Sequence, residues 1–311
     1  MITGAREGIG AACAQEFLHR GARLSLIDVS SEKPEYDDGG ALWTIGDITD
    51  EEICREAVAA TTAHFGGIDI LINNAGVGLF ATASESSLQC AGRVFEVNLW
   101  APIALTRLVL PQMRERGSGA VINIESIGSW VSLPWSAMYC ASKHALHAYT
   151  RSLHHEVCRE GIHVMSVVPG IVETRFRAHV IGGHAPEGVT RIKRTISPQS
   201  LAASIADGLV KGKHTVVKPR IGWAFWAVEV FFPQVMHWYV CRRWTGSAHA
   251  SSTRVCAAPG YWTGAAAGPE RVCAKMRLPP DVKPTRHSGD PLIAGAPKED
   301  RLIGSTSSKT K

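Results

Sequence analysis

Short apolar runs alternate with longer amphipathic stretches along residues 1–220. A period of about 3.6 residues predicts a helix, whereas a short continuous apolar run is typical of a buried strand. We therefore expect strands at 22–27, 41–45, 68–72, 120–124, 163–168 and 214–217, and helices at 11–18, 51–65, 88–114, 137–159 and 198–211. Strands that are apolar on both faces belong to parallel sheets with helices on each side. The pattern predicts a Rossmann-type, doubly wound α/β fold in three layers.

Two local signals mark where helices begin. The sequence Thr-Asp-Glu-Glu at 49–52 has the form of a capping box, with Thr49 in its first position. Near the amino terminus, Gly4, Gly8 and Gly10 run directly into the helical pattern at 11–18. Such glycines let the backbone approach a pyrophosphate, which the free N–H groups at a helix start would bind. Many glycine-rich turns bind nothing, so this signal depends on its context.

The context is an acidic residue at the end of the next apolar run. Asp28 follows the run at 22–27, about twenty residues after the glycines, where dinucleotide-binding folds place an acid. Its carboxylate could accept hydrogen bonds from the ribose hydroxyls of an adenosine, and it would repel a 2′-phosphate. The pattern therefore favours NAD over NADP as the cofactor.

A second, independent signal lies on the helix expected at 137–159. Tyr139 and Lys143 are four residues apart, so they share one helix face. Because a nearby ammonium favours the phenolate, we expect Lys143 to lower the pKa of Tyr139 from its ordinary value of about 10. Ser126, just after the run at 120–124, could hold a carbonyl or alcohol oxygen against this phenol. Such a pair alone is usually ordinary packing, but beside a dinucleotide site it predicts general acid–base chemistry.

These motifs together resemble the short-chain dehydrogenase/reductase family over roughly residues 1–220. In chain order they are Thr3-Gly4-x3-Gly8-Ile9-Gly10, Asp47-Ile48, Asn73-Asn74-Ala75-Gly76, Asn98, Ser126, Tyr139-x3-Lys143 and Pro169-Gly170-x3-Thr174. The resemblance implies an oxidoreductase that interconverts an alcohol and its carbonyl. It also implies that the chain forms a homo-oligomer, as many family members do. The alternative is a non-catalytic Rossmann-type protein that binds a nucleotide or regulates, although the presence of all four candidate catalytic residues argues against it.

The resemblance also implies a role for each motif. Tyr139 would donate or accept the proton, Ser126 would bind the reacting oxygen, and Lys143 would hold the nicotinamide ribose. Asn98 would position a water that links Lys143 to solvent, unless it is a satisfied core amide. Asp47 and Ile48 would meet the adenine, 74–76 would line the cofactor floor, and 169–174 would enclose the carboxamide. The implied cofactor-binding residues are Thr3, Gly4, Arg6, Gly8, Ile9, Gly10, Asp28, Asp47, Ile48, Asn74, Ala75, Gly76, Tyr139, Lys143, Pro169, Gly170, Val172 and Thr174.

Two departures from the family pattern lie near the amino terminus. Only Met1 and Ile2 precede the Thr3-Gly4 turn, so the first strand is expected to be truncated and the cofactor turn weakened. The native start could lie upstream. In addition, Arg6 stands one place before the position where many NADP-using members carry a basic residue, and Glu7 occupies that position. This arrangement again favours NAD.

A third departure follows residue 220. The segment 221–240 is apolar and rich in aromatic residues, and basic and tryptophan residues flank it. About twenty residues could cross a bilayer. However, polar interruptions favour an interfacial pair of helices within 221–244, broken at Pro233. A dimer or substrate-lid helix, a true span and ordinary packing remain open as alternatives. This apolar surface favours a lipophilic alcohol or ketone, and the resemblance suggests a steroid, retinoid or fatty-acyl compound.

The remaining segments shape the substrate site or lie outside it. Residues 128–138, with Trp130 and Trp135, are expected to form one pocket wall, unless the tryptophans belong to the core or an interface. Residues 176–195 would form a flexible lid. The small, proline-interrupted segment 245–311 is expected to be disordered. Three regions follow: a catalytic domain at 1–220, an extension at 221–244 and this tail.

Composition adds limits to this picture. The 311 residues are 45% hydrophobic and 20% charged, with a formal net charge of +5. Eight cysteines without paired metal spacing predict a reducing, cytoplasmic location. The apolar segment after residue 220 adds the expectation of peripheral membrane contact. Thirteen histidines include the adjacent pair His154 and His155, whose side chains would point to different faces, so we expect no metal site. No stacking or groove-reading motif accompanies the basic tail, so nucleic-acid binding is not expected.

Overall fold

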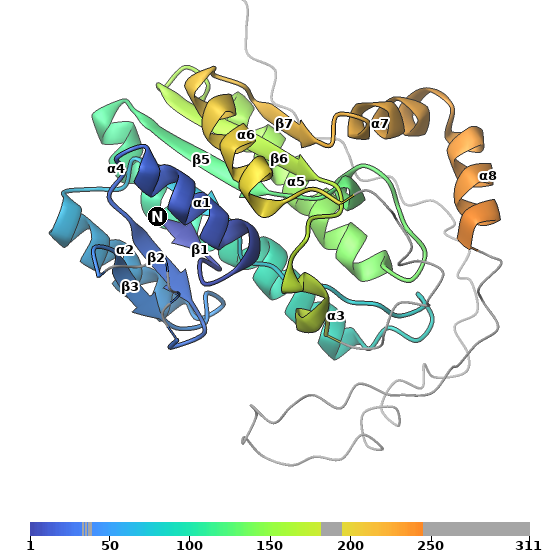
Figure 1. Ribbon diagram of the computed structural model, residues 1–311, viewed down its shortest axis with the longest axis horizontal. Helices are drawn as coiled ribbons and strands as arrows, with labels where there is room; N and C mark the ends of the chain where they lie inside the picture. The colour runs from blue at the N-terminus through green and yellow to red at the C-terminus, as the bar shows by residue number, and fades with distance from the viewer. Residues whose placement is uncertain (33, 35, 37–38, 182–194, 245–311) are drawn as a thin grey trace, which may run out of the picture. The chain divides into compact units, whose positions relative to one another are not determined.

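The computed structural model describes residues 1–32, 34, 36, 39–181 and 195–244. Seven parallel strands form one sheet in the order β3-β2-β1-β4-β5-β6-β7 (Figure 1). The strands are β1 Ile2–Thr3, β2 Ser25–Asp28, β3 Leu42–Ile45, β4 Ile70–Asn73, β5 Gly119–Ile124, β6 Ile162–Pro169 and β7 Thr215–Lys218. From β1 the chain adds strands toward one edge of the sheet, and from β4 it adds them toward the other edge. At such a switch point, doubly wound folds open a ligand crevice at the carboxyl ends of the strands.

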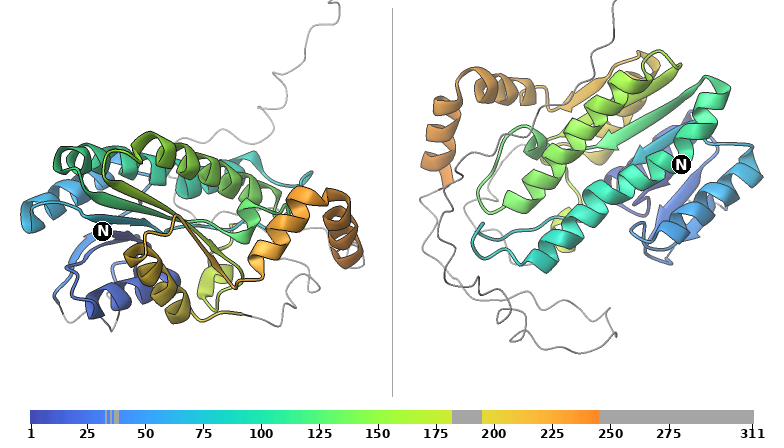
Figure 2. Two further views of the ribbon diagram at one scale, coloured as in Figure 1. Left: turned by 90° about the horizontal axis from the view of Figure 1, so that it is seen from above. Right: turned by 180° about the vertical axis from the view of Figure 1, so that it is seen from behind.

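Helices cover both faces of this sheet (Figure 2). On one face lie α1 Gly8–His19 and α6 Pro198–Val210, and on the other lie α2 Glu51–Phe65, α4 Ala101–Arg116 and α5 Ala137–Val157. Neighbouring strand residues point to opposite faces, so Ile72 joins the cluster under α1 while Leu71 joins the cluster under α4. Burial on both faces explains the continuous apolar runs, and the predicted three-layer Rossmann-type fold is confirmed.

Helix α2 begins where the sequence predicts, but its capping residue differs. Asp50 is the N-cap, and its carboxylate accepts a hydrogen bond from the backbone N–H of Glu52 at 2.9 Å. The Thr49 hydroxyl instead donates to the Asp47 carboxylate at 2.9 Å. The capping box expected with Thr49 in its first position is therefore wrong, because the Thr49 hydroxyl oxygen accepts from the Arg93 guanidinium at 2.6 Å instead of from the helix.

The helix expected at 88–114 is divided by a turn of π-helix. It consists of α3 Leu88–Phe95, the π-helical turn η1 Glu96–Trp100 and α4. Single π turns within α-helices recur at functional sites, and this one carries Asn98. In the described part of the chain, 88–116 is also the one helix long and apolar enough to span a membrane by composition. Its apolar window is 56% buried inside the fold, as in a core helix.

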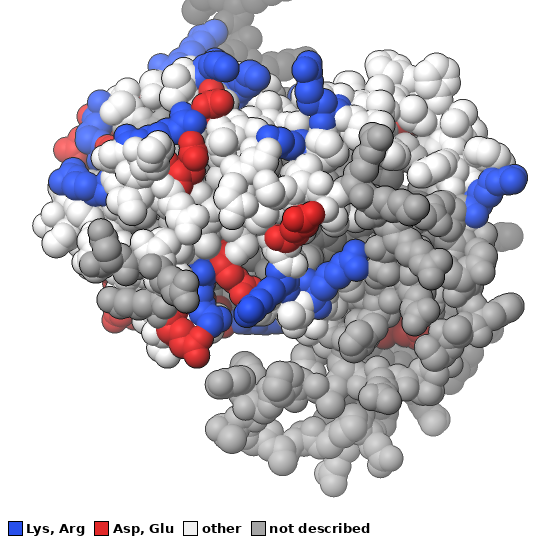
Figure 3. Space-filling model, viewed as in Figure 1, with Lys and Arg blue, Asp and Glu red and all other residues white. Residues whose placement is uncertain are grey.

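Two further helices follow β7. They are α7 Gly222–Phe231 and α8 Pro233–Trp244, so the predicted helix pair broken at Pro233 is present. Trp226 and Met236 pack against Trp130 and Val168 of the preceding chain. The outer side exposes large apolar side chains, namely Ile221, Trp223, Val230, Phe231, Phe232, Val235, Trp238 and Tyr239. In Figure 3, the upper right of the molecule, where these helices lie, shows few charged side chains.

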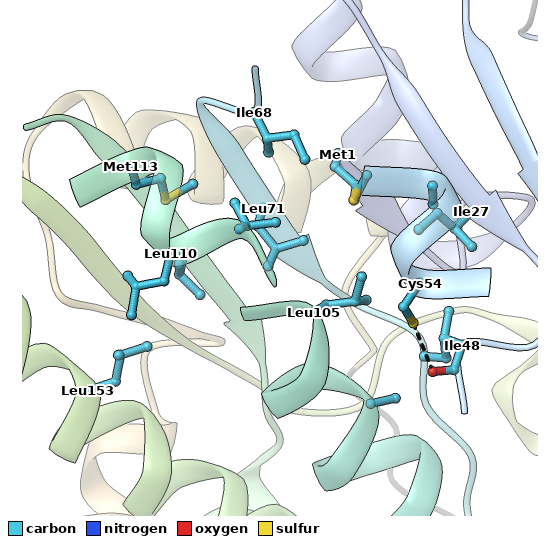
Figure 4. Packing of buried hydrophobic residues seen from close by; sticks show 14 of the residues in the cluster. Met1, Ile27, Ile48, Cys54, Ile68, Leu71, Leu105, Leu110, Met113 and Leu153 are labelled. Carbon is cyan, nitrogen blue, oxygen red and sulfur yellow. Dashed lines mark hydrogen bonds between the residues drawn. The ribbon is translucent and has the colours of Figure 1, made fainter. Parts of the chain in front are cut away.

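Strand β1 is short but lies at the centre of the sheet. Ile2 is paired with Leu26 of β2 and with Ile72 of β4, and it is 2% exposed. The amino group of Met1 donates to the carbonyl of Ile70 at 2.7 Å, and the Met1 carbonyl accepts from Ile72 at 2.9 Å. The Met1 side chain lies in a core cluster (Figure 4). The predicted truncation is confirmed, and the short strand keeps both of its neighbours.

Two predictions fall largely outside the described residues. The segment 245–311, expected to be disordered, is not described, and neither are residues 182–194 of the expected lid. The described beginning of the lid forms a short 3-10 helix, η3 Arg175–His179, after which Ile181 donates to the carbonyl of Gly78 at 2.8 Å. This segment therefore reaches the loop that follows β4.

Candidate active site

The glycine-rich turn is held by the strand on each side of it. Gly4 has φ of +62° and donates its N–H to the carbonyl of Ile27 at 2.8 Å. The Thr3 hydroxyl accepts hydrogen bonds from the backbone N–H groups of Asn74 and Ala75, both at 3.0 Å. The Asn74 amide donates to the carbonyls of Thr3 and Gly4, both at 2.9 Å. These hydrogen bonds hold the turn in place, and the weakening expected from the short first strand stays a prediction.

The turn also leaves space that only glycine can provide. A Cβ atom on Gly10 would lie 2.0 Å from the carbonyl oxygen of Gly4, so no other residue fits there. Glu7 precedes α1 without a side-chain hydrogen bond to the helix, so the first N–H groups have no cap from that residue. Free N–H groups beside a glycine cradle fit the pyrophosphate of a dinucleotide.

A cleft of about 760 Å³ opens beside this turn. Its walls come from the start of α1, from the loop after β2 and from the loop after β6, including Arg6, Gly8, Glu32 and Thr174. Thr174 lies close to the turn, since a Cβ on Gly8 would be 3.1 Å from the Thr174 methyl group. The structure therefore brings together the glycine motif and the end of the Pro169–Thr174 motif.

The loop at 169–174 is fixed by its neighbours. Gly170 donates to the carbonyl of Lys218 at 2.7 Å, and Val172 forms a bridge with Ile196. The Thr174 hydroxyl caps η3 by accepting the N–H of Phe176 at 3.3 Å. The ring of Phe176 lies 5.8 Å from the ring of Tyr139, so the chain after the loop covers the candidate catalytic phenol.

Asp28 lies at the end of β2 and faces the turn. Its two carboxylate oxygens accept hydrogen bonds from the backbone N–H groups of Arg6 and Ser30, both at 3.0 Å. Since a carboxylate has about four acceptor positions, capacity remains for ribose hydroxyls. The Arg6 guanidinium forms an ion pair with Glu32, so its charge is already compensated.

The residues expected at the adenine are more constrained than the sequence suggests. The Asp47 carboxylate accepts from Thr49 and forms an ion pair with Arg93. Partial burial opposes ionisation, but the Thr49 amide and the Arg93 guanidinium hold the pKa of Asp47 below its ordinary value. Ile48 is buried in the core, 7% exposed. The contacts of both residues with adenine stay predictions.

The catalytic candidates meet at the carboxyl end of β5. Ser126 follows this strand directly, while Tyr139 and Lys143 lie near the start of α5. The Ser126 hydroxyl lies near the Tyr139 phenol and acts to lower its pKa. Gly128 packs against both, because a Cβ at that position would lie 3.4 Å from each of them. The structure thus joins residues that lie thirteen positions apart in the chain.

The protonation of this pair differs from the expectation. Burial raises the pKa of Tyr139 to about 12, and the nearby Ser126 hydroxyl offsets only part of this effect. The Lys143 ammonium donates to the carbonyl of Ile124 at 2.9 Å. Burial lowers the pKa of Lys143 to about 8, against the Glu125 carboxylate, which acts in the opposite direction. The predicted lowering of the Tyr139 pKa by Lys143 is therefore wrong for the protein without a bound dinucleotide, because burial dominates.

Asn98 is buried and its amide is satisfied. The amide oxygen accepts the N–H of Val77, and the amide nitrogen donates to the carbonyl of Val77, each at 2.9 Å. The nitrogen also donates to the Ser142 hydroxyl at 3.1 Å. A Cβ on Gly76 would lie 3.2 Å from the Asn98 oxygen and 3.5 Å from the Lys143 nitrogen. Asn98 is thus both a satisfied core amide and a neighbour of Lys143, the candidate catalytic lysine.

Sequence reasoning missed two residues beside this site. Glu125 precedes Ser126 and is completely buried, and His147 contacts its carboxylate at 2.7 Å. The spacing of Tyr139, Lys143 and His147 at four-residue intervals places all three on one face of α5. That spacing was the available signal for His147, whereas nothing in the sequence distinguishes Glu125 from a surface acid.

Trp130 belongs to the core rather than to an open pocket wall. It is 8% exposed, and its ring lies 5.2 Å from Trp223 and 6.2 Å from Trp226 of α7. Trp135 has a positive φ of 66°, and its carbonyl accepts the N–H of Ala81 at 2.9 Å. The alternative that Trp130 packs in the core is therefore the one observed.

The histidines form a cluster at the opposite end of the sheet. The ring of His154 lies 4.2 Å from that of His214, which lies 4.8 Å from the ring of His163. Within the residues described, no group of at least three His, Cys, Asp or Glu side chains could hold a metal ion. The cluster therefore gives no support for a metal centre in the described part of the chain.

Comparison with known proteins agrees with this fold. Residues 1–182 match the family described as short chain dehydrogenase. The chain is 31% identical over 238 residues to dehydrogenase/reductase SDR family member 7B of Danio rerio, covering 71% of this chain and 77% of that protein.

Two solved structures are similar in fold. A short chain dehydrogenase from Burkholderia cenocepacia J2315 in complex with NADP has a TM-score of 0.66 and 25% identity, covering 76% of this chain and 94% of that one. The 3-ketoacyl-(acyl-carrier-protein) reductase from Brucella melitensis, complexed with NADH, has a TM-score of 0.62 and 27% identity, covering 70% and 94%.

The sheet order, the glycine cradle and the Ser126–Tyr139 pair define a dinucleotide-dependent oxidoreductase. The chain belongs to the short-chain dehydrogenase/reductase family, and its activity is NAD(P)-dependent oxidoreduction.

Proposed function

We propose that the protein interconverts an alcohol and its carbonyl by hydride transfer, with Tyr139 handling the proton. The observation that carries this proposal is the convergence of Ser126 and Tyr139 around Gly128, with buried Lys143 on the same helix as Tyr139, at the carboxyl edge of the sheet. A dinucleotide bound at the glycine turn would supply or accept the hydride. The non-catalytic alternative offers no reason for a buried lysine beside a serine and a phenol at this edge.

Ser126, Tyr139 and Lys143 have different roles in the proposed proton transfer. The hydroxyls of Ser126 and Tyr139 converge, so both can hold the oxygen of a substrate. With its pKa at about 12, Tyr139 carries its proton at neutral pH and is ready to donate it to a carbonyl oxygen. In the oxidative direction Tyr139 accepts the alcohol proton, and the positive charge of Lys143 stabilises the resulting phenolate.

Removing the phenol tests this proposal. We expect Tyr139→Phe to bind NADH as tightly as the parent protein while turnover falls by roughly 10²- to 10⁴-fold, the usual contribution of a general acid or base. Tyr149→Phe is the matched control, since Tyr149 lies on the same helix and outside the site. Turnover of hydrophobic ketones and alcohols would be followed by NADH absorbance. Retained turnover in Tyr139→Phe would contradict the role of the phenol.

For the cofactor, we propose a preference for NAD. Asp28 places a carboxylate at the end of β2 beside the glycine turn, where it would repel a 2′-phosphate. Arg6 is the nearby cation, and its pairing with Glu32 leaves it less able to attract that phosphate. Both features favour NAD over NADP. Tighter binding of NADPH than of NADH would contradict this preference.

For the substrate and location, we propose a lipophilic substrate and peripheral membrane contact through α7 and α8, in the cytoplasm. The exposed apolar side chains of this pair support the idea, including Phe231 at 66% and Trp238 at 59% exposure. Arg242 lies over the Trp238 ring at 5.4 Å, the combination of cation and aromatic that suits a headgroup layer. With 10 and 12 residues, neither helix alone reaches across a bilayer.

A further inference from the structure

Residues 175–181, here called the strap, connect the two sides of the candidate cofactor crevice. They comprise η3 and the two residues that follow it. The strap begins next to Thr174, which lies beside Gly8 in the turn after β1. It ends at Ile181, which donates to the carbonyl of Gly78 in the loop after β4 at 2.8 Å. Strands β1 and β4 flank the switch point of the sheet, where doubly wound folds bind their ligand.

Glu7 holds the strap from the side of the glycine turn. Nε2 of His179 donates a hydrogen bond to the Glu7 carboxylate at 2.7 Å, across 172 positions of the chain. Nη1 of Arg175 lies 3.9 Å from the other carboxylate oxygen. Arg175 and His179 are the first and last residues of η3, so one carboxylate contacts both ends of this short helix.

The direction of the Glu7 side chain matters for the anion site. Glu7 occupies the N-cap position of α1 but makes no side-chain hydrogen bond to that helix. A carboxylate turned toward the helix start would compete with a pyrophosphate for the first N–H groups. Because His179 and Arg175 draw the carboxylate toward the strap, those N–H groups stay available, and the Arg175 guanidinium offsets the negative charge beside them.

The strap is held by a different kind of contact on the side of Gly78. A Cβ on Gly78 would lie 3.1 Å from the ring of Phe176 and 3.2 Å from Val180, so apolar groups pack closely there. The contacts with Glu7 are more accessible to water, since the side chain of His179 is 54% exposed. Exposed ion pairs are weak, whereas apolar contacts persist in water. The side at Glu7 should therefore open first.

We propose that Glu7, with His179 and Arg175, forms a clasp that holds the strap over a bound dinucleotide and slows its release. This inference deepens the proposed function, because it rests on a dinucleotide bound at the glycine turn. The three residues act on the departure of the cofactor. Proton transfer at Tyr139 does not involve them.

The rate at which NADH leaves the protein tests the clasp. Displacement of bound NADH by excess NAD⁺, followed by the loss of NADH fluorescence in a stopped-flow instrument, gives this rate without any substrate. We expect His179→Ala to raise the rate about two- to fivefold, the range that one exposed ion pair contributes. In Glu7→Ala protein the same substitution should have no further effect, because the partner of His179 is already gone.

Two further variants separate the clasp from general effects of charge. His179→Lys keeps a donor and a positive charge, so NADH should leave at a rate close to that of the parent protein. Arg177→Ala removes an exposed cation from the same short helix. Arg177 forms no ion pair with any of the residues that the structure describes, so its loss should leave the rate unchanged.

Hydrogen exchange reports the strap itself in protein without cofactor. The backbone amides of η3 should exchange about two- to fivefold faster in His179→Ala than in the parent protein, because the side at Glu7 opens more often. The amide of Ile181, which is bonded to Gly78, should keep its parent rate. Equal exchange of the η3 amides in both proteins would contradict the clasp.

The clasp and the proposed function fail separately. The clasp is overturned if His179→Ala raises the NADH release rate equally with and without Glu7, or in neither protein. Should NADPH bind more tightly than NADH, the same displacement with NADPH and NADP⁺ tests the clasp, and only the cofactor preference is overturned. A release rate that depends on both residues, in a protein that turns over no alcohol or ketone, supports the clasp and overturns the proposed function.

Discussion

Tyr139 and Lys143 show how strongly the environment of a residue can change its pKa. A phenol and an ammonium on one helix face predict a lowered tyrosine pKa, yet burial raises that pKa to about 12. The lysine directs its charge to the carbonyl of Ile124, which lies 19 positions earlier in the chain. The protein alone therefore holds a protonated phenol suited to carbonyl reduction. Positive charge from a bound, oxidised nicotinamide would assist the reverse reaction.

At the same scale, Asp28 is the residue on which cofactor preference depends. We expect Asp28→Asn to keep an acceptor for the N–H of Arg6 while removing the charge that repels a 2′-phosphate. The ratio of NADPH to NADH affinity should rise by about tenfold, since a hydrogen bond to a charged group contributes roughly 1.5–3 kcal/mol. Fluorescence titration with both cofactors measures this ratio.

The control for this variant is Asp69→Asn, whose carboxylate is 85% exposed. It should leave both affinities unchanged. If Asp28→Asn leaves the ratio unchanged as well, the carboxylate does not select the cofactor.

The identities of the site residues were more predictable than their contacts. Position along the chain was enough to select Ser126, Tyr139 and Lys143, because each stands at a fixed distance from the end of a strand or along a helix. The contacts of Asp47 with Arg93, and of Glu125 with His147, could not be predicted in this way. Each joins segments from different parts of the chain, and long side chains can turn to several partners.

At the scale of elements, apolar runs predicted the strands because both faces of a parallel sheet are buried. The bounds of α2 were also predicted, whereas its capping residue was not, since the Thr49 hydroxyl oxygen accepts from Arg93, a residue 44 positions later in the chain. The π-helical turn at Glu96–Trp100 had no counterpart in the sequence pattern. Its extra residue shifts the helix face locally, and periodicity averaged over many residues does not reveal such a shift.

The exposed face of α7 and α8 leads to a prediction about membranes. The triple variant Phe231→Ser, Phe232→Ser and Trp238→Ser should reduce the fraction of protein that floats with anionic liposomes by about tenfold or more. Burying one large apolar side chain contributes up to roughly 1.5–3 kcal/mol, so the loss of three exceeds the energy of a tenfold change. Binding of NADH should be unaffected.

Serine at Leu88 and Val210 provides the control, because both side chains are apolar and highly exposed on other helices. Flotation of that variant should equal that of the parent protein. Equal flotation of the triple variant would exclude this face as the anchor. A change of oligomeric state in light scattering would indicate instead that the face joins two copies of the chain.

At the scale of the whole molecule, the histidine cluster links distant parts of the chain. It joins α5, β6 and the residue before β7 through His154, His163 and His214. Burial and then neighbouring positive charge lower the pKa of His154, and burial likewise lowers that of His163. The folded state therefore takes up protons less readily than the unfolded chain. The stabilisation that these histidines contribute is fully present above their pKa in the unfolded chain, about 6.5, and is lost as the pH falls below that value.

We expect the thermal midpoint to decrease between pH 7.5 and pH 5.5, and His214→Gln to make this decrease shallower. Calorimetry or circular dichroism across this range measures it. His19→Gln, at an exposed position on α1, should keep the slope of the parent protein. A steeper or identical slope in His214→Gln would show that acid sensitivity arises elsewhere.

One feature of the fold affects how truncation experiments should be interpreted. Trp130 packs under α7 with one part of its indole and orients His147 with another. A protein shortened after β7 would expose this ring to water and loosen the imidazole of His147, which lies one helical turn after Lys143. Kinetic defects in such a shortened enzyme could then arise entirely from chemistry within the domain, with no lipid involved.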